Sequence, residues 1–90
     1  MPSRRFEIQI AASAARALRK LDQPTRKRLA RQIESLAADP RPHGAKKLAG
    51  EPNLYRVRSR DHRIIYTVQD RVLIILVVAI GHRRDIYRRS

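Results

Sequence analysis

Arginines occupy the positions of this sequence that could do chemistry. Arg56, Arg58 and Arg63 lie within residues 54–66, where charged and apolar side chains alternate. A guanidinium group stays protonated at ordinary pH and binds phosphate oxygens through paired, charge-assisted hydrogen bonds. The same pattern also fits a solvated strand face without a ligand. Because no acidic residue faces these arginines in the expected strand pairing, their mutual repulsion favours a site for an anion.

The arginines meet only if residues 54–66 form two adjacent β-strands. Side chains alternate between the two faces of a strand, so a two-residue turn at residues 60–61 places Arg58 opposite Arg63, with Arg56 on the same face. The apolar residues then gather on the other face, and a slip of one residue would scatter both sets. Residues 60–61 lack the Gly or Asn that such a turn prefers, which leaves a four-residue loop with the same facing as the alternative.

Further basic and aromatic residues lie on either side of this hairpin, and each has a passive alternative. Arg83 and Arg84 could add positive charge to the same face or form a solubilising tail. Tyr87 could stack on a base or anchor the tail by packing on the sheet. Lys46 and Lys47 could contact a phosphate backbone or be ordinary solvated lysines. These five residues extend the candidate surface beyond the hairpin.

One of the three histidines is a candidate for acid–base catalysis. His62 stands at the tip of the hairpin, and because imidazole titrates near neutrality it is a candidate general acid or base. His43 and His82 are far from it in sequence, no acidic residue stands at a metal-ligand spacing from any of the three, and cysteine is absent. We therefore expect no metal site, no cofactor and no thiolate chemistry. No Gly-rich phosphate loop, Ser-His-Asp pattern or paired-carboxylate site is visible.

The overall charge points to a polyanionic partner. The 90 residues include 21 Lys and Arg against 8 Asp and Glu, a formal net charge of +13. Nucleic acid is the first candidate partner, an acidic protein the second and an anionic membrane surface the third. The longest apolar run, residues 72–80, is too short to span a membrane, and the first residues lack a signal-peptide core. These features predict one small, soluble, cytoplasmic domain.

Two helices are predicted before the hairpin. Residues 5–10 alternate as a first strand, and Ser13 is the expected N-cap of a helix that ends near Leu21. Residues 22–25 form a turn into a second helix, with proline in its first turn, and the Asp-Pro pair at 39–40 should end it. The apolar face of the second helix consists of Leu29, Ile33, Leu36 and Ala37.

The remaining segments complete an α+β fold. Residues 41–53 contain proline and glycine turn signals and are predicted to form a loop. Residues 72–80 are apolar on both faces, as in a strand near the middle of a sheet. Continuing the strand pairing places Val78 opposite Arg63, and Gly81 is expected to end the strand. The order β-α-α-β-β-β predicts two helices packed on one face of a small antiparallel sheet.

Several of these segments resemble the RelE/ParE toxin superfamily. The matching motifs are DPRPHGAKKLAG at 39–50, LYRVR at 54–58, DHRIIY at 61–66 and VAIGHRRDIY at 78–87. The likeness includes the two helices and covers residues 1–90 as a single toxin domain. It implies a RelE-like fold and the toxin half of a type II toxin–antitoxin pair. The implied partner is a cognate antitoxin that is acidic and wraps around the toxin, and the implied pair could bind operator DNA.

The superfamily contains two activities. RelE-type members are metal-independent nucleases that cut messenger RNA in the ribosomal A site, whereas ParE-type members inhibit DNA gyrase and lack the nuclease residues. A nucleic-acid-binding module without catalysis is a third alternative. The basic positions resemble the RelE side, which implies mRNA and the ribosome as partners. The positions that match RelE-type catalytic residues are Arg56, Arg58, Arg63, Arg83 and Tyr87.

The resemblance also implies a mechanism in which the RNA 2′-hydroxyl attacks the adjacent phosphate. Arginines at 58, 63 and 83 would stabilise the transition-state charge, Tyr87 would stack on a base, and Arg56 would orient the nucleophile. Two positions depart from the family pattern. Arg56 stands where a lysine has been assigned as general base, and a guanidinium is a poor base. Ala49 stands where some nucleases carry another basic residue. Positioning must therefore supply much of the rate.

Overall fold

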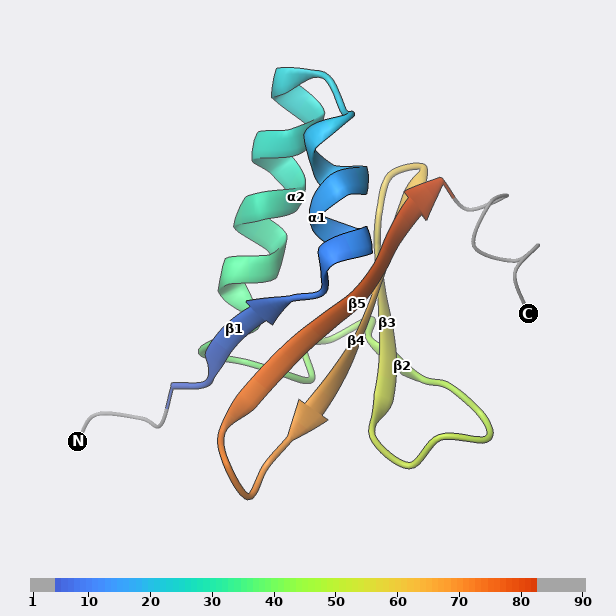
Figure 1. Cartoon of the computed structure of the whole chain (residues 1–90). Helices are drawn as coiled ribbons and strands as arrows, with labels where there is room; N and C mark the ends of the chain where they lie inside the picture. Colours follow the sequence, from blue (N-terminus) through green and yellow to red (C-terminus); the bar gives the residue numbers. More distant parts are fainter. Residues whose placement is uncertain (1–4, 83–90) are drawn as a thin grey trace.

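Two helices lie side by side on one face of a five-stranded sheet (Figure 1). The structure is a computed structural model that describes residues 5–82. The elements are β1 (Glu7–Ile10), α1 (Ala12–Arg19), α2 (Gln23–Ser35), β2 (Lys46–Lys47), β3 (Leu54–Ser59), β4 (His62–Gln69) and β5 (Ile74–His82). The predicted α+β fold with two N-terminal helices is confirmed. Three candidate residues, Arg83, Arg84 and Tyr87, lie outside the described residues.

The sheet differs from the expected antiparallel one at both edges. The strand order is β1-β5-β4-β3-β2, and β1 runs parallel to β5 while the other neighbours are antiparallel. The strand β1 can pair in parallel with β5 because two helices, and not a tight turn, follow β1 in the chain. The strand β2 forms within the predicted loop, where Lys46 pairs with Arg56 and Lys47 with Tyr55.

The helix α2 and the two residues after it pack on the sheet through the face that the periodicity predicted. Leu29, Ile33, Leu36 and Ala37 are all buried. The predicted cap of α1 is wrong, because the helix begins at Ala12 after Ala11, with no side-chain cap. The Ala11 amide donates to the Val77 carbonyl of β5 at 2.9 Å. The hydrogen bond to the sheet therefore sets the start of α1.

The hairpin of β3 and β4 has the predicted register. Arg58 pairs with Arg63 and Arg56 with Ile65, so the turn contains residues 60–61 alone. Arg60 takes a φ of 56°, the left-handed region that the turn requires and that glycine tolerates best. The turn forms without glycine because a long cross-strand ladder stabilises it, and the strain stays local.

Replacing Arg60 with glycine is expected to stabilise the fold by about 0.5–1 kcal/mol. The substitution relieves roughly 1–2 kcal/mol of left-handed strain and adds a smaller entropy to the unfolded chain. Thermal unfolding followed by circular dichroism measures the change. The control is Arg71→Gly in the β4–β5 turn, where φ is not positive and glycine should lower the melting temperature. Equal shifts in the two variants would contradict the assignment of strain to Arg60.

A β-bulge in β5 changes the expected pairing with β4. The strand begins at Ile74, two residues later than predicted, and Tyr66 pairs with Val77. Beyond this pair the register shifts, so that Ile65 pairs with Ala79 and Val78 is the extra residue. The predicted pairing of Val78 with the arginine is therefore wrong, because a bulge inserts one residue that the alternation of the sequence does not reveal.

The bulge decides which side chains of β5 enter the core. Ile80 pairs with Ile64, and both are buried between sheet and helices. Gly81 continues the strand, contrary to expectation, and pairs with Arg63. A glycine at this position leaves room above the sheet for the long arginine side chain. The bulge thus places Ile80 in the core on the helix side of the sheet and places Gly81 beside Arg63 on the other face.

Candidate nucleic-acid interface

The sheet face opposite the helices collects the predicted basic residues. In one row across the strands Lys46 pairs with Arg56, which pairs with Ile65. In the next row Arg58 pairs with Arg63. Side chains at these positions share one face, since they alternate with the buried residues of β3 and β4. We call the surface formed by Lys46, Arg56, Arg58 and Arg63 the arginine face.

Arg58 and Arg63 form the centre of the arginine face. Directly opposed residues on neighbouring antiparallel strands have Cβ atoms about 4.5–5.5 Å apart, so two like charges repel there. Arg58 is exposed, whereas Arg63 retains only 7% of its accessible surface. Reduced access to water strengthens the attraction between a buried cation and an incoming anion. A phosphate bound across both residues would relieve the repulsion and accept hydrogen bonds from both.

The two lysines of β2 lie on opposite faces. Lys46 joins the arginine face beside Arg56, whereas Lys47 pairs with Tyr55 on the helix side. A loop, as predicted from the sequence, would give Lys46 and Lys47 no fixed orientation relative to the sheet. Pairing with β3 separates them, because successive strand residues point to opposite faces. Of the two, Lys46 is therefore positioned to contact a phosphate bound on the arginine face.

His62 is not brought onto the arginine face. It pairs with Ser59 and alternates with Arg63, so it shares the face of Ile64. Its ring lies edge-on to that of His82, with the centroids 5.8 Å apart. Its Nδ1 atom is buried and has no hydrogen-bond partner among residues 5–82. A proton-transfer role at a phosphate on the arginine face would therefore require reaching around the sheet.

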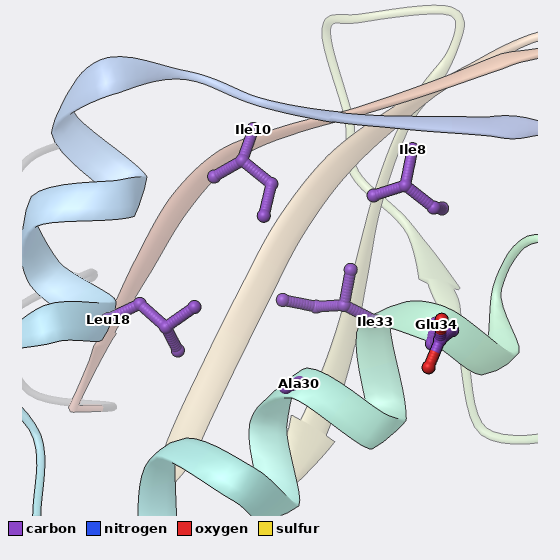
Figure 2. Close-up of a pocket in the computed structure, with 6 residues that line it drawn as sticks. All are labelled: Ile8, Ile10, Leu18, Ala30, Ile33 and Glu34. Atoms are coloured by element: carbon purple, nitrogen blue, oxygen red, sulfur yellow. The ribbon is translucent and has the colours of Figure 1, made fainter.

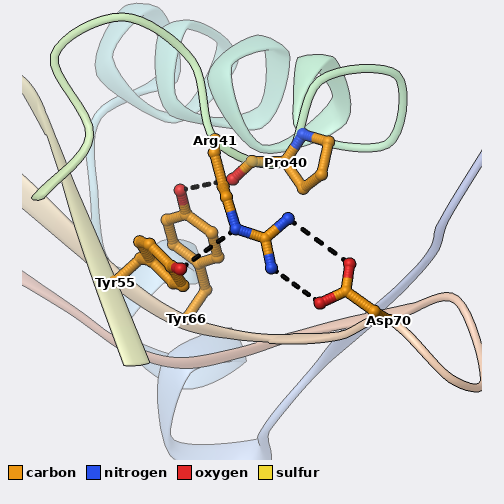
Figure 3. Close-up of polar contacts among 5 residues, drawn as sticks. All are labelled: Pro40, Arg41, Tyr55, Tyr66 and Asp70. Atoms are coloured by element: carbon orange, nitrogen blue, oxygen red, sulfur yellow. Dashed lines mark hydrogen bonds and ion pairs between the residues drawn. The ribbon is translucent and has the colours of Figure 1, made fainter. Parts of the chain in front are cut away.

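The loop that leads to β2 is fastened by contacts that the sequence did not indicate (Figure 3). Arg41 makes an ion pair with Asp70, with Nη2 2.6 Å from Oδ2, and its Nε donates to the Tyr55 hydroxyl at 3.0 Å. The hydrogen bond from Arg41 lowers the pKa of the Asp70 carboxyl. The Tyr66 hydroxyl donates to the Pro40 carbonyl at 2.8 Å. These contacts join the loop after α2 to the β4–β5 turn.

Replacing Tyr66 with phenylalanine is expected to lower stability at pH 7 by about 1–3 kcal/mol, because the Pro40 carbonyl loses its donor. Burial raises the pKa of Tyr66 to about 12, so the unfolded chain ionises first, from near pH 10. The contribution of this hydroxyl is therefore complete below pH 10 and lost as the pH rises through 12.

Urea unfolding at pH 7, 10 and 11 checks this expectation. The parent protein should lose more stability than Tyr66→Phe between pH 10 and 11. Tyr55→Phe is the matched control, because it removes a phenol from the same site and leaves the Tyr66 hydroxyl in place. Parallel pH profiles of the parent and Tyr66→Phe would show that the buried hydroxyl does not cause the alkaline loss.

A hollow lies on the helix side of the sheet, away from the arginine face. It has a volume of about 220 Å³ between β1 and the two helices. Figure 2 shows Ile8 and Ile10 of β1 pointing toward Ile33 and Leu18, which makes the lining of the hollow mainly apolar.

Within residues 5–82 no group of three or more His, Cys, Asp and Glu side chains could hold a metal ion. No helix in the same range is long and apolar enough to cross a membrane.

Comparison with known proteins identifies the class. A family model described as "ParE toxin of type II toxin-antitoxin system, parDE" matches residues 8–87. The chain belongs to the RelE/ParE superfamily of toxins from type II toxin–antitoxin systems.

The similar proteins lie close to RelE. The chain is 31% identical over 87 residues to a RelE-like toxin protein of Escherichia coli, covering 92% of this chain and 90% of the relative. It is 32% identical over 72 residues to the mRNA interferase toxin RelE of E. coli K12, covering 78% of this chain and 75% of that protein.

Solved structures agree with this placement. A chain in the crystal structure of the intact E. coli RelBE toxin–antitoxin complex superposes with a TM-score of 0.76 at 25% identity, covering 86% of this chain and 95% of that chain. A chain in the archaeal RelE–RelB complex from Pyrococcus horikoshii superposes with a TM-score of 0.78 at 26% identity, covering 87% and 94%. The RelE-like fold expected from the sequence motifs is thereby confirmed.

Proposed function

We propose that this toxin is a ribosome-dependent endoribonuclease that cleaves messenger RNA in the A site. The observation that carries the proposal is the direct pairing of Arg58 with Arg63, next to a row containing Lys46 and Arg56. This arrangement suits an RNA phosphate on the sheet face that the helices leave open. The similarity to a protein named mRNA interferase toxin RelE supports the same activity.

Cleavage would proceed by attack of the RNA 2′-oxygen on the adjacent phosphorus. The 2′-hydroxyl gives its proton to solvent as the 2′-O–P bond forms, the P–O5′ bond breaks, and the leaving 5′-oxygen takes a proton from solvent. The products are a 2′,3′-cyclic phosphate and a 5′-hydroxyl end. Negative charge grows on the non-bridging oxygens in the transition state, and Arg58, Arg63 and Arg83 would stabilise it. Arg56 would orient the nucleophile, and Tyr87 would stack on a base. These roles need no metal ion or cofactor, and the ribosome would align the substrate.

The other proposed contacts extend around this site. Lys46 and Arg84 would bind RNA outside the reacting phosphate, with Lys46 placed beside Arg56 by register. Lys47 and His62 lie on the helix-side face, so they would bind only RNA that passes around the edge of the sheet. The single toxin domain of residues 1–90 would be neutralised by an acidic cognate antitoxin, and the pair could bind operator DNA. The toxin–antitoxin complexes among the similar structures support such a partner. The nuclease would act in the cytoplasm, where messages are translated.

Inhibition of DNA gyrase is the second candidate function. The match of residues 8–87 to the ParE toxin model favours it. In that case the basic surface would contact a protein, and messages would stay intact.

Induced expression followed by mapping of messenger 5′ ends separates the candidates. A ribosome-dependent nuclease should produce new 5′ ends in phase with codons, and these ends should vanish when an inhibitor blocks ribosome loading. Intact messages together with inhibited supercoiling by purified gyrase would overturn the nuclease proposal in favour of gyrase. Salt-dependent RNA binding with neither effect would indicate a nucleic-acid-binding module without catalysis.

A further inference from the structure

A hollow adjoins the arginine face on the same side of the sheet. It has a volume of about 390 Å³, and the residues that line it include Glu51, Leu54, Thr67, Gln69 and Leu76. The loop between β2 and β3, which forms one wall, projects on the side away from the helices (Figure 1). Leu54, Thr67 and Gln69 alternate in phase with the arginines and therefore share their face of the sheet.

Strand register places the hollow next to the arginine face. Leu54 pairs with Thr67, and Thr67 pairs with Leu76. This row lies two residues along the strands from the row that contains Arg56 and Ile65. Side chains two residues apart on a strand share a face and are separated by roughly 7 Å. A ligand that covers both rows therefore needs an anionic part for the arginines and a second part that fits the hollow.

The lining suits a nucleobase better than a second phosphate. Leu54 and Leu76 supply apolar surface, and Glu51 is the one ionisable residue in the lining. Its carboxylate repels phosphate oxygens but accepts hydrogen bonds. Gln69 Nε2 donates to Thr67 Oγ1 at 3.1 Å, which orients the amide and presents its carbonyl oxygen as another acceptor. The hollow thus combines apolar walls with the acceptors of Glu51 and Gln69 and with the side-chain amide of Asn53, which can both donate and accept.

We propose that the hollow binds one base of the RNA strand whose phosphate lies on the arginine face, and that it selects a base with an exocyclic amino group. Adenine, cytosine and guanine present such a donor, whereas uracil presents carbonyl oxygens in its place. Uracil offers its ring N3–H as the sole base-edge donor, between two carbonyl oxygens, so it would leave either the Glu51 carboxylate or the Gln69 carbonyl without a donor. This inference rests on the proposed nuclease function, and it assigns cut-site selection to residues outside the catalytic set.

Cut-site mapping in a reconstituted translation system tests this selection. A message library is treated with the parent protein, Glu51→Gln or Gln69→Leu, and 5′ ends are counted at every codon. In the parent, uracil should be depleted at one fixed position relative to the cut. Glu51→Gln exchanges one acceptor oxygen for an amide donor, and Gln69→Leu removes the carbonyl acceptor. Each should therefore reduce that depletion by about two- to tenfold, the effect of a single hydrogen bond.

Glu34→Gln is the charge-matched control. Glu34 lies on α2 beside the helix-side hollow, and its replacement raises the net charge by the same amount as Glu51→Gln. The control should keep the base preference of the parent, and thermal unfolding confirms that all variants fold. If both hollow variants cut at the same sites as the parent, base selection by the hollow is overturned and the nuclease stands. If the parent cleaves no message, both proposals fall.

Discussion

Replacing Arg58 with alanine is expected to lower the rate of message cleavage by about a hundred- to a thousandfold, with little change in stability. Removing one preorganised donor that stabilises transition-state charge typically has this effect. Arg58 is exposed on its strand, so truncation leaves no core cavity. Single-turnover cleavage of a defined message on programmed ribosomes measures the rate, and the melting temperature reports the fold.

Two further variants sharpen this prediction. Arg58→Lys should recover part of the rate, since a lysine keeps the charge but loses the two-pronged hydrogen bonding of arginine. Arg31→Ala is the matched control, because it removes an exposed arginine from α2, on the opposite side of the sheet. A uniform loss in both alanine variants would indicate a general effect of net charge. Wild-type cleavage by Arg58→Ala would remove this residue from the catalytic set.

Replacing Ile80 with alanine is expected to destabilise the protein by about 2–5 kcal/mol, the usual cost of truncating a buried isoleucine. The bulge at Val78 turns Ile80 to the helix side of the sheet, where it pairs with Ile64 and retains only 7% of its accessible surface. The truncation therefore leaves a cavity in the core. For a domain of this size the melting temperature should fall by at least about 8 °C.

Val78→Ala is the control for this variant. It shortens the extra residue of the bulge, which is half-buried and lies outside the core, so we expect a much smaller loss of stability. Cleavage by the folded Ile80→Ala variant should stay close to that of the parent, because Ile80 lies on the face opposite the arginine face. Equal losses of stability in the two variants would show that the bulge does not place Ile80 in the core.

The sequence alone determined the features that depend on local periodicity. The register of β3 and β4 followed from alternation, because a slip of one residue would expose apolar side chains such as Ile64 and bury charges. The buried face of α2 followed from its helical period, with Leu29 and Ile33 inside. Local periodicity and cross-strand facing were therefore sufficient to bring Arg58 and Arg63 together.

Tertiary structure decided the features that join residues far apart in the chain. The strand β2 exists because β3 offers an edge to Lys46, and the bulge at Val78 exists because the core needs Ile80. Arg41 and Asp70 meet across 29 positions, and no local pattern links them. Alternation and helical period report which face a residue occupies, but not which distant segment packs against it. The hollow beside the arginines depends on that second kind of information, since a loop and three strands must meet to form it.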